Sequence, residues 1–324
     1  MQTETHIEYF KRRSFGDLIN ITIEFIRINF KALIKSLLYI AGPAIIIISG
    51  IVLHLMSKAF NLLKNSVAGE SDLFEGMIGE FIISIFLLLI VSFVGVVLLL
   101  CLSKAFLNTY QTDKEKLGDP QYMWSQCKKD FGTVSLNYFL SFFIVIIPFM
   151  LLLMPVFLVA AFVPIIGQLV LLAISAAFGM FYLLVLLISM LENKSIVDSV
   201  SRAFTLLKDS WMSATGYYLV INLMANFISI IFILPLYVMF IFYLLHNADP
   251  GSTPTFELPA YLEIISAVLF IFFIVSTVIL YSFQVIGMGF QYYSLREHKE
   301  STGLLQKIES IGEDSSPEEK DEQF

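Results

Sequence analysis

Residues 131–191 decide the fold: they read FGTVSLNYFLSFFIVIIPFMLLLMPVFLVAAFVPIIGQLVLLAISAAFGMFYLLVLLISML, 61 positions without one charged side chain. An α-helix rises about 1.5 Å per residue, so about 20 residues cross the roughly 30 Å hydrocarbon core of a bilayer. This stretch is therefore long enough for two membrane-spanning helices. Proline and glycine favour a turn between them, and the predicted hinge is Val163-Pro164-Ile165-Ile166-Gly167.

Four further charge-free stretches each predict one more span. A charged residue at the centre of a membrane helix costs about 2.5–3.5 kcal/mol on insertion scales, so stretches without charge mark the spans. They cover residues 36–57, 81–103, 210–248 and 264–295. The third ends in turn-forming residues, 246–251, and holds a single helix. The chain is thus predicted to cross the membrane six times.

The amino-acid composition also indicates a membrane protein. Apolar and aromatic residues make up 57% of its 324 positions and charged residues only 15%, against roughly 25% in soluble domains. The formal net charge of −7 argues against a nucleic-acid partner, and two cysteines exclude a disulfide scaffold. The polar segment Met1–Arg13 is unlike a signal peptide, so the first span is expected to stay as an anchor. The predicted fold class is an all-α polytopic membrane protein.

The distribution of lysine and arginine predicts the orientation. With six spans both termini lie on one side, and eighteen of the twenty basic residues fall on that side. Only Lys58 and Lys64 fall on the other. Basic residues concentrate in cytoplasmic loops, so both termini are expected in the cytoplasm.

Three segments of similar design precede the odd-numbered spans and suggest an internal repeat. The first opens on Ser14-Phe15-Gly16-Asp17 and the third on Ser195-Ile196-Val197-Asp198, both typical of a helix capping box. The middle copy opens on Asp119-Pro120, with the proline at a favourable first helical position. The approximate repeats are residues 14–107, 117–192 and 195–295.

Each opening segment is predicted to form a short amphipathic helix in the cytoplasmic interface, followed by a transmembrane hairpin. The first copy would present a polar stripe made of Asp17, Asn20, Glu24, Arg27 and Lys31. Ten residues after each opening aspartate stands a basic residue suited to anionic lipid: Arg27, Lys129 and Lys208. The alternative is that these segments are ordinary cytoplasmic helices that pack on one another.

We expect residues 1–312 to form a single membrane domain. Near its end, Leu304, Leu305, Ile308 and Ile311 are spaced for one more short helix. Residues 313–324 carry six acids and one lysine, a composition typical of a disordered tail.

Several segments give the chain a family resemblance. They are the SFGD and SIVD openings, Ser199–Trp211 (SVSRAFTLLKDSW) and Gln291–Lys299 (QYYSLREHK). With them the chain resembles, over about residues 14–300, a broad bacterial family of six-span membrane proteins related to the membrane domain of glycerophosphodiester phosphodiesterases. The resemblance implies a protein of the bacterial inner (cytoplasmic) membrane. We expect no catalytic domain outside the spans, so the phosphodiesterase activity is not carried over.

Few residues of this chain are suited to chemistry. No acid, lysine or arginine lies within an apolar span core, the four histidines are scattered, and phosphate-loop and hydrolase motifs are absent. We therefore expect no enzymatic activity, no cofactor and no metal. The most polar intramembrane face joins Asn222, Asn226 and Ser229, at i, i+4 and i+7, with Gln284 on the next span. Such residues bond neighbouring helices, or else they line a path for a ligand.

Two functions remain open on the sequence. The first is a non-enzymatic scaffold or accessory module that contacts membrane lipids, or a membrane or cytoplasmic protein, through the amphipathic segments. The second is a transporter or channel for a small neutral or lipid-like solute that passes along the Asn222 and Asn226 face. The first accounts better for the three amphipathic segments and for the concentration of basic residues on one side.

Overall fold

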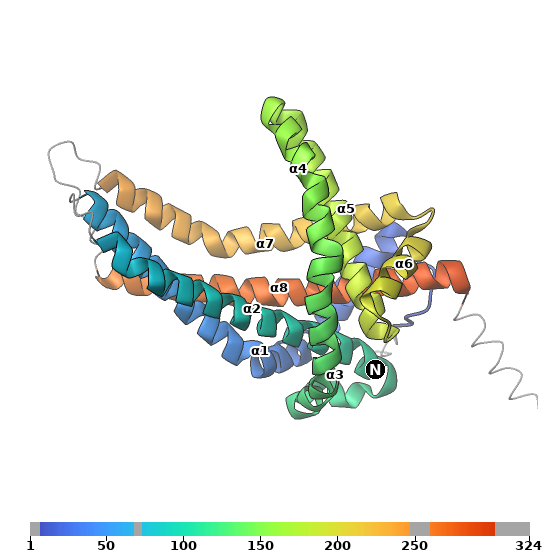
Figure 1. Ribbon diagram of the computed structural model, residues 1–324. Helices are drawn as coiled ribbons and strands as arrows, with labels where there is room; N and C mark the ends of the chain where they lie inside the picture. The colour runs from blue at the N-terminus through green and yellow to red at the C-terminus, as the bar shows by residue number, and fades with distance from the viewer. Residues whose placement is uncertain (1–6, 68–72, 247–259, 302–324) are drawn as a thin grey trace, which may run out of the picture. The chain divides into compact units, whose positions relative to one another are not determined.

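The computed structural model describes residues 7–67, 73–246 and 260–301, and every regular element among them is a helix (Figure 1). The helices are α1 Phe15–Val67, α2 Leu73–Thr112, α3 Pro120–Ser141, α4 Ile147–Phe162, α5 Pro164–Leu191, α6 Ile196–Leu207, α7 Trp211–His246 and α8 Ala260–Glu300. A 3₁₀ helix, Lys114–Gly118, precedes α3, and a π-helical segment, Phe142–Ile146, joins α3 to α4. The predicted acidic tail, residues 313–324, and the apolar positions before it lie outside the described residues.

Six stretches of these helices are long and apolar enough to cross a membrane, which confirms the number that the charge-free stretches predicted. They are Phe15–Lys58, Ile78–Thr112, Pro120–Phe157, Ile165–Leu191, Trp211–Met239 and Ile264–Glu300. The break within residues 131–191 also falls at the predicted hinge, because Val163 separates α4 from α5 and Pro164 opens α5. A proline fits there because the first helical residues have no intrahelical acceptor for an amide hydrogen.

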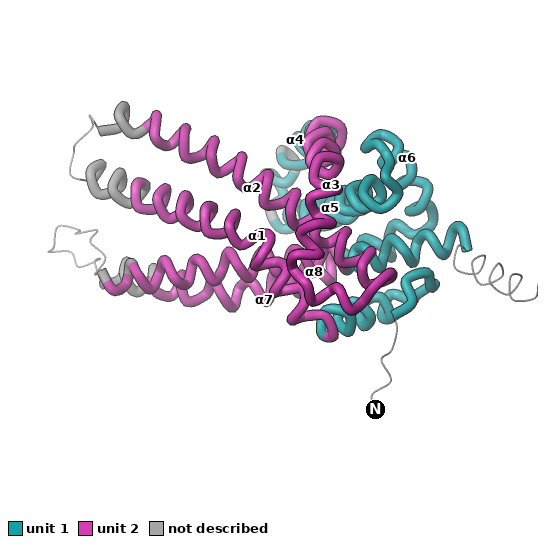
Figure 2. Tube along the Cα trace, turned by 90° about the horizontal axis from the view of Figure 1, so that it is seen from below, with its two compact units in different colours: residues 1–27, 148–218, 287–324 teal, residues 28–147, 219–286 magenta. Residues whose placement is uncertain are grey.

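The described helices belong to two compact units, which Figure 2 colours separately. Unit 1 comprises Met1–Arg27, Pro148–Tyr218 and Gly287–Phe324, and unit 2 comprises Ile28–Ile147 and Leu219–Ile286. Each unit combines pieces of all three predicted repeats, so neither coincides with a single repeat. Segments far apart in the sequence therefore form each core.

The two predicted capping boxes form with matching geometry. Ser14 Oγ lies 2.7 Å from Asp17 Oδ2, and the Asp17 amide donates to Ser14 Oγ at 3.3 Å. In the third copy Ser195 Oγ lies 2.6 Å from Asp198 Oδ2, and the Asp198 amide donates back at 3.2 Å. Each cap satisfies an amide that the first helical turn leaves without a backbone acceptor.

A separate short helix before the span, predicted for all three copies, is found only in the third. There α6 ends at Leu207, and Asp209 adopts a φ of 73°, a left-handed conformation that stops the helix before α7 begins. In contrast, α1 runs without a break for 53 residues from Phe15. The absence of glycine and proline does not separate the two copies, because residues 195–211 also contain neither; the difference is the left-handed conformation of Asp209, which no residue of α1 adopts.

The apolar face of the first segment packs within unit 1. Phe25 has no exposed surface, and its ring centroid lies 5.1 Å from that of Phe290 and 6.5 Å from that of Tyr9. Leu18 and Thr22, on the same side of α1, are also buried. This face contacts protein, which fits the alternative of packed helices better than a helix lying in lipid.

In unit 2, α2 and α3 pack along the part of α2 that is most buried. Lys104 is 7% exposed, and its Nζ donates to Asp130 Oδ1 at 2.8 Å. Cys101 and Cys127 are both buried and free. On the other side of α2, a Cβ at Gly95 would lie 3.8 Å from Ala44 of α1, an ordinary contact distance.

Candidate functional site

Unit 1 contains a polar pocket of about 310 Å³. Three segments line it: the chain just before and at the start of α1, the start of α7, and the end of α8. Its lining residues are Arg12, Arg13, Ser14, Leu18, Ser210, Ser213, Gln291, Ser294, Leu295 and His298, and none of them is acidic. We call this cavity the polar pocket.

Helix geometry explains why these side chains meet. Gln291, Ser294, Leu295 and His298 stand at i, i+3, i+4 and i+7 and so share one face of α8. The other two segments are helix beginnings, since Ser14 caps α1 and Ser210 directly precedes α7. Two helix N-termini therefore reach the same pocket.

A buried hydrogen-bonded cluster holds the three helices together beside the pocket. Thr22 Oγ1 of α1 lies 2.8 Å from Tyr217 Oη of α7, and Tyr217 Oη donates to the Gly287 carbonyl of α8 at 3.0 Å. A Cβ at Gly287 would lie 3.0 Å from both Thr22 Cγ2 and Tyr217 Oη. Glycine thus permits the close approach of α8 that places its polar face in the pocket.

The basic residues of the pocket are held in place by hydrogen bonds rather than by carboxylates. Arg12 Nε donates to His298 Nδ1 at 3.0 Å. The backbone amide of Arg13 donates to Ser294 Oγ at 3.2 Å, and the Arg13 guanidinium donates to the Tyr9 carbonyl at 3.1 Å. Burial lowers the pKa of Arg13 below its ordinary value, and the nearby carboxylates of Glu8 and Asp17 only partly oppose this. The Arg13 cation is therefore poorly solvated, and an anion in the pocket would stabilise it.

Gln291 is the most deeply buried polar side chain of the pocket. It is 3% exposed, and its Oε1 atom has no hydrogen-bond partner in the part of the chain that the structure describes. A buried acceptor without a partner costs about 1–3 kcal/mol. A bound group with a hydrogen-bond donor would remove that cost.

A charged network on the opposite face of α8 connects it to α5 and α6. Arg202 Nε donates to Glu192 Oε1 at 3.2 Å, and Arg202 Nη2 also donates to Glu300. Tyr292 Oη donates to Glu192 Oε1 at 2.9 Å, and Arg296 Nε donates to Glu300 Oε2 at 2.9 Å. Both glutamates are paired with cations, Glu192 also with Lys194, so this network is suited to holding helices in place rather than to binding a charged ligand.

This network predicts a dependence of stability on pH. Burial by itself raises the pKa of Glu192, but hydrogen bonds from Lys194 and Tyr292 and the charge of Arg202 outweigh it, so this pKa lies below its usual 4.5. The folded state thus favours the ionised carboxylate. Its stabilising contribution is present above pH 4.5 and is lost as the pH falls through the lowered value.

The measurement compares thermal unfolding of the wild type and Glu192→Gln in detergent from pH 7 down to pH 3. We expect the variant to be less stable near neutral pH and the difference to shrink in acid. Glu115→Gln, on the 3₁₀ helix of unit 2 and outside this network, is the control for removing a carboxylate elsewhere. A constant difference across the pH range would contradict the assignment.

The residues that the sequence singled out do not line the polar pocket. Asn226 Nδ2 donates to both the carbonyl and Oδ1 of Asn222 at 2.8 Å, within α7. Ser229 is half-buried on α7 and Gln284 half-buried on α8, and all four residues belong to unit 2. The three predicted interfacial basic residues are exposed, Arg27 and Lys208 in unit 1 and Lys129 in unit 2.

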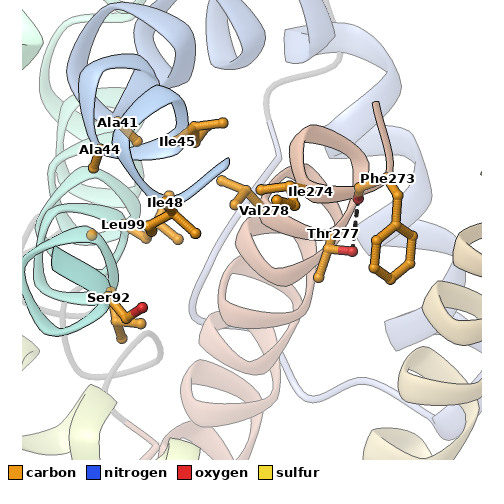
Figure 3. Close-up of a pocket in the computed structure, with 12 residues that line it drawn as sticks. Ala41, Ala44, Ile45, Ile48, Ser92, Leu99, Phe273, Ile274, Thr277 and Val278 are labelled. Carbon is orange, nitrogen blue, oxygen red and sulfur yellow. Dashed lines mark hydrogen bonds between the residues drawn. The ribbon is translucent and has the colours of Figure 1, made fainter. Parts of the chain in front are cut away.

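Unit 2 has an apolar cavity of about 220 Å³ between α1, α2 and α8 (Figure 3). Ser92 and Thr277 are its only hydroxyl-bearing lining residues. Thr277 donates its hydroxyl to the Phe273 carbonyl of its own helix at 2.9 Å, as the dashed line in Figure 3 shows. The cavity is therefore suited to apolar atoms and offers a polar solute little to bind.

Sequence reasoning missed the polar pocket, although two signals pointed to it. Arg12 and Arg13 immediately precede a helix cap, and Gln291 and His298 are two turns apart on the last helix. Neither signal by itself indicates that the two segments meet. Across the residues that the structure describes, no group of three or more His, Cys, Asp and Glu side chains is placed to hold a metal ion.

Comparison with family models, with curated proteins and with solved structures finds no match for this chain. The class of this protein is therefore stated from its fold and its pocket alone. It is a multi-pass helical membrane protein with a fixed, basic, polar pocket built from three separate segments.

Proposed function

We propose that the chain is a non-enzymatic scaffold or accessory protein of the bacterial cytoplasmic membrane, acting on a membrane lipid or a membrane partner. The observation that carries this proposal is the polar pocket of unit 1. Its three segments, residues 12–14, 210–213 and 291–298, all fall on the side where the distribution of lysine and arginine predicts the cytoplasm. A basic pocket on that side is suited to the anionic groups of the inner leaflet.

The arrangement of the pocket favours binding over catalysis. A serine nucleophile needs a histidine base within hydrogen-bond distance. Here His298 Nδ1 instead accepts a hydrogen bond from Arg12, and Ser294 Oγ accepts one from the Arg13 amide. The guanidinium groups of Arg12 and Arg13 keep donors for a ligand, and Gln291 Oε1 keeps an acceptor.

The first and third predicted repeats share one structural feature. The capping boxes at Ser14 and Ser195 have matching geometry. Residues 291–299, which carry part of the resemblance, contribute one wall of the polar pocket. Transport of a neutral solute is the weaker proposal, because the Asn226 amide is already bonded to Asn222 within its own helix.

The experiment that tests this function is a gentle affinity purification of the full chain from native membranes, with mass spectrometry of the co-purifying proteins and lipids. We expect either one stoichiometric protein partner or one lipid enriched well above its share of the membrane. An unselective lipid profile without any stoichiometric protein would contradict the proposal.

A further inference from the structure

We propose that the polar pocket is a binding site for a phosphate ester, whose phosphate meets Arg12 and Arg13 and whose organic part donates a hydrogen bond to Gln291. This inference deepens the proposed function and rests on it. It assigns the pocket a ligand class, and the shared chemistry could be offered by a lipid headgroup or by a soluble phosphate ester.

The charges around the pocket favour an anion. Arg12 and Arg13 line it, and each guanidinium has more N–H donors than its present contacts use, although that of Arg13 already donates to the carbonyls of Tyr9, Lys11 and Glu8. The nearest acids are committed elsewhere: Asp17 accepts from its Ser14 cap, and Asp209 pairs with Lys299 at 3.0 Å. Glu8, which faces Arg13, does not line the cavity.

Two helix beginnings strengthen the preference for phosphate. The first turns of α1 and α7 have amide groups without intrahelical acceptors, and the dipole of each helix places partial positive charge there. Ser210 and Ser213 add hydroxyl donors at the start of α7, whereas the Ser14 hydroxyl already donates to Asp17. Arginine forks, hydroxyls and helix N-termini together match the several acceptor oxygens of a phosphate better than the two of a carboxylate.

Gln291 is the independent observation that indicates a bound group. Its side chain lines the pocket, is 97% buried, and has an Oε1 atom without a partner among the described residues. The side-chain amide of a glutamine offers both an acceptor and donors. A ligand with a hydroxyl or ammonium group beside its phosphate would satisfy the acceptor, and inorganic phosphate does so with its own hydroxyl.

The test measures ligand-induced thermal stabilisation of the full chain in lipid nanodiscs. One arm adds inorganic phosphate to discs of phosphatidylcholine, against chloride at equal ionic strength. The other arm compares phosphatidylcholine discs with discs that contain phosphatidylglycerol, whose headgroup is anionic and carries hydroxyls. A saturable rise with inorganic phosphate supports a soluble ester, and a rise only with phosphatidylglycerol supports a lipid headgroup.

Variants connect the effect to the pocket. We expect Arg12→Ala to weaken binding about tenfold, as loss of one charge-assisted contact predicts. Gln291→Glu should abolish binding by placing a second negative charge against the phosphate. Lys194→Ala removes a cation of unit 1 that does not line the pocket and should leave binding unchanged. Should Gln291→Glu fail to fold, Ser213→Ala, at an exposed lining position, takes its place with a smaller expected loss.

The inference is overturned if neither arm stabilises the protein, or if Lys194→Ala weakens binding as much as Arg12→Ala. Its failure can be told apart from failure of the proposed function. If Arg12→Ala still co-purifies the same protein or lipid as the wild type, the function stands and the assigned site is wrong.

Discussion

Gly167→Ala is expected to destabilise the protein by about 2–3 kcal/mol, the upper part of the roughly 1–3 kcal/mol found when side-chain atoms are forced into a packed core. Gly167 is buried in the first turn of α5. A Cβ at this position would contact the Cα of Ala160 in α4. It would also lie 2.6 Å from the Ala160 Cβ and 3.0 Å from the Ala160 carbonyl oxygen. Real Cβ atoms do not approach backbone so closely, so the turn between α4 and α5 must open.

The measurement is unfolding of the purified protein by increasing SDS in mixed micelles, followed by tryptophan fluorescence and circular dichroism. Gly132→Ala in α3 is the matched control, because a Cβ there meets nothing within 4 Å. That control should gain about 0.5–1 kcal/mol, since alanine restricts the unfolded chain more than glycine does. Equal behaviour of the two variants would show that α4 and α5 do not approach each other this closely.

Arg202→Leu is expected to cost about 2 kcal/mol of unfolding free energy. The change removes the cation that bridges Glu192 and Glu300, and the Glu192 side chain is only 10% exposed. Removing one partner of a fully buried pair costs about 3–5 kcal/mol. The Arg202 and Glu300 side chains are 20% and 31% exposed, so water screens part of the lost interaction.

Lys194→Ala provides the comparison for this prediction. Lys194 Nζ lies 2.7 Å from Glu192 Oε2, but its side chain is 41% exposed. A pair this exposed contributes about 0–1 kcal/mol. Both variants are measured by the same SDS titration. If Arg202→Leu costs no more than Lys194→Ala, the network does not hold α5, α6 and α8 together.

The membrane helices could be predicted from the sequence because their cause is local. The absence of charge over 131–191, together with Pro164, was sufficient to place two spans and the break between them, and the capping boxes were visible as Ser-x-x-Asp. Each of these signals acts within a few residues. The structure reproduces them because hydrocarbon leaves an unpaired backbone few alternatives to a helix.

The polar pocket could not be predicted in the same way. It joins Arg12 to Ser213 and His298, which are roughly two hundred and nearly three hundred positions away, and no periodicity relates such positions. The sequence also could not show that the first repeat lacks a separate short helix. A polar stripe shows which side of a helix is polar, but it does not show whether the helix ends at Lys31 or continues, as α1 does.

The apolar cavity of unit 2 has a different meaning in a bilayer from the one it would have in water. In the core of a soluble protein, an empty space of 220 Å³ would cost about 5 kcal/mol at roughly 24 cal/mol per Å³. Around a membrane helix the solvent is itself hydrocarbon, and Thr277, which lines the cavity, is exposed. A methylene segment of a neighbouring acyl chain would fit such a space, so in a bilayer the cavity would not carry that cost.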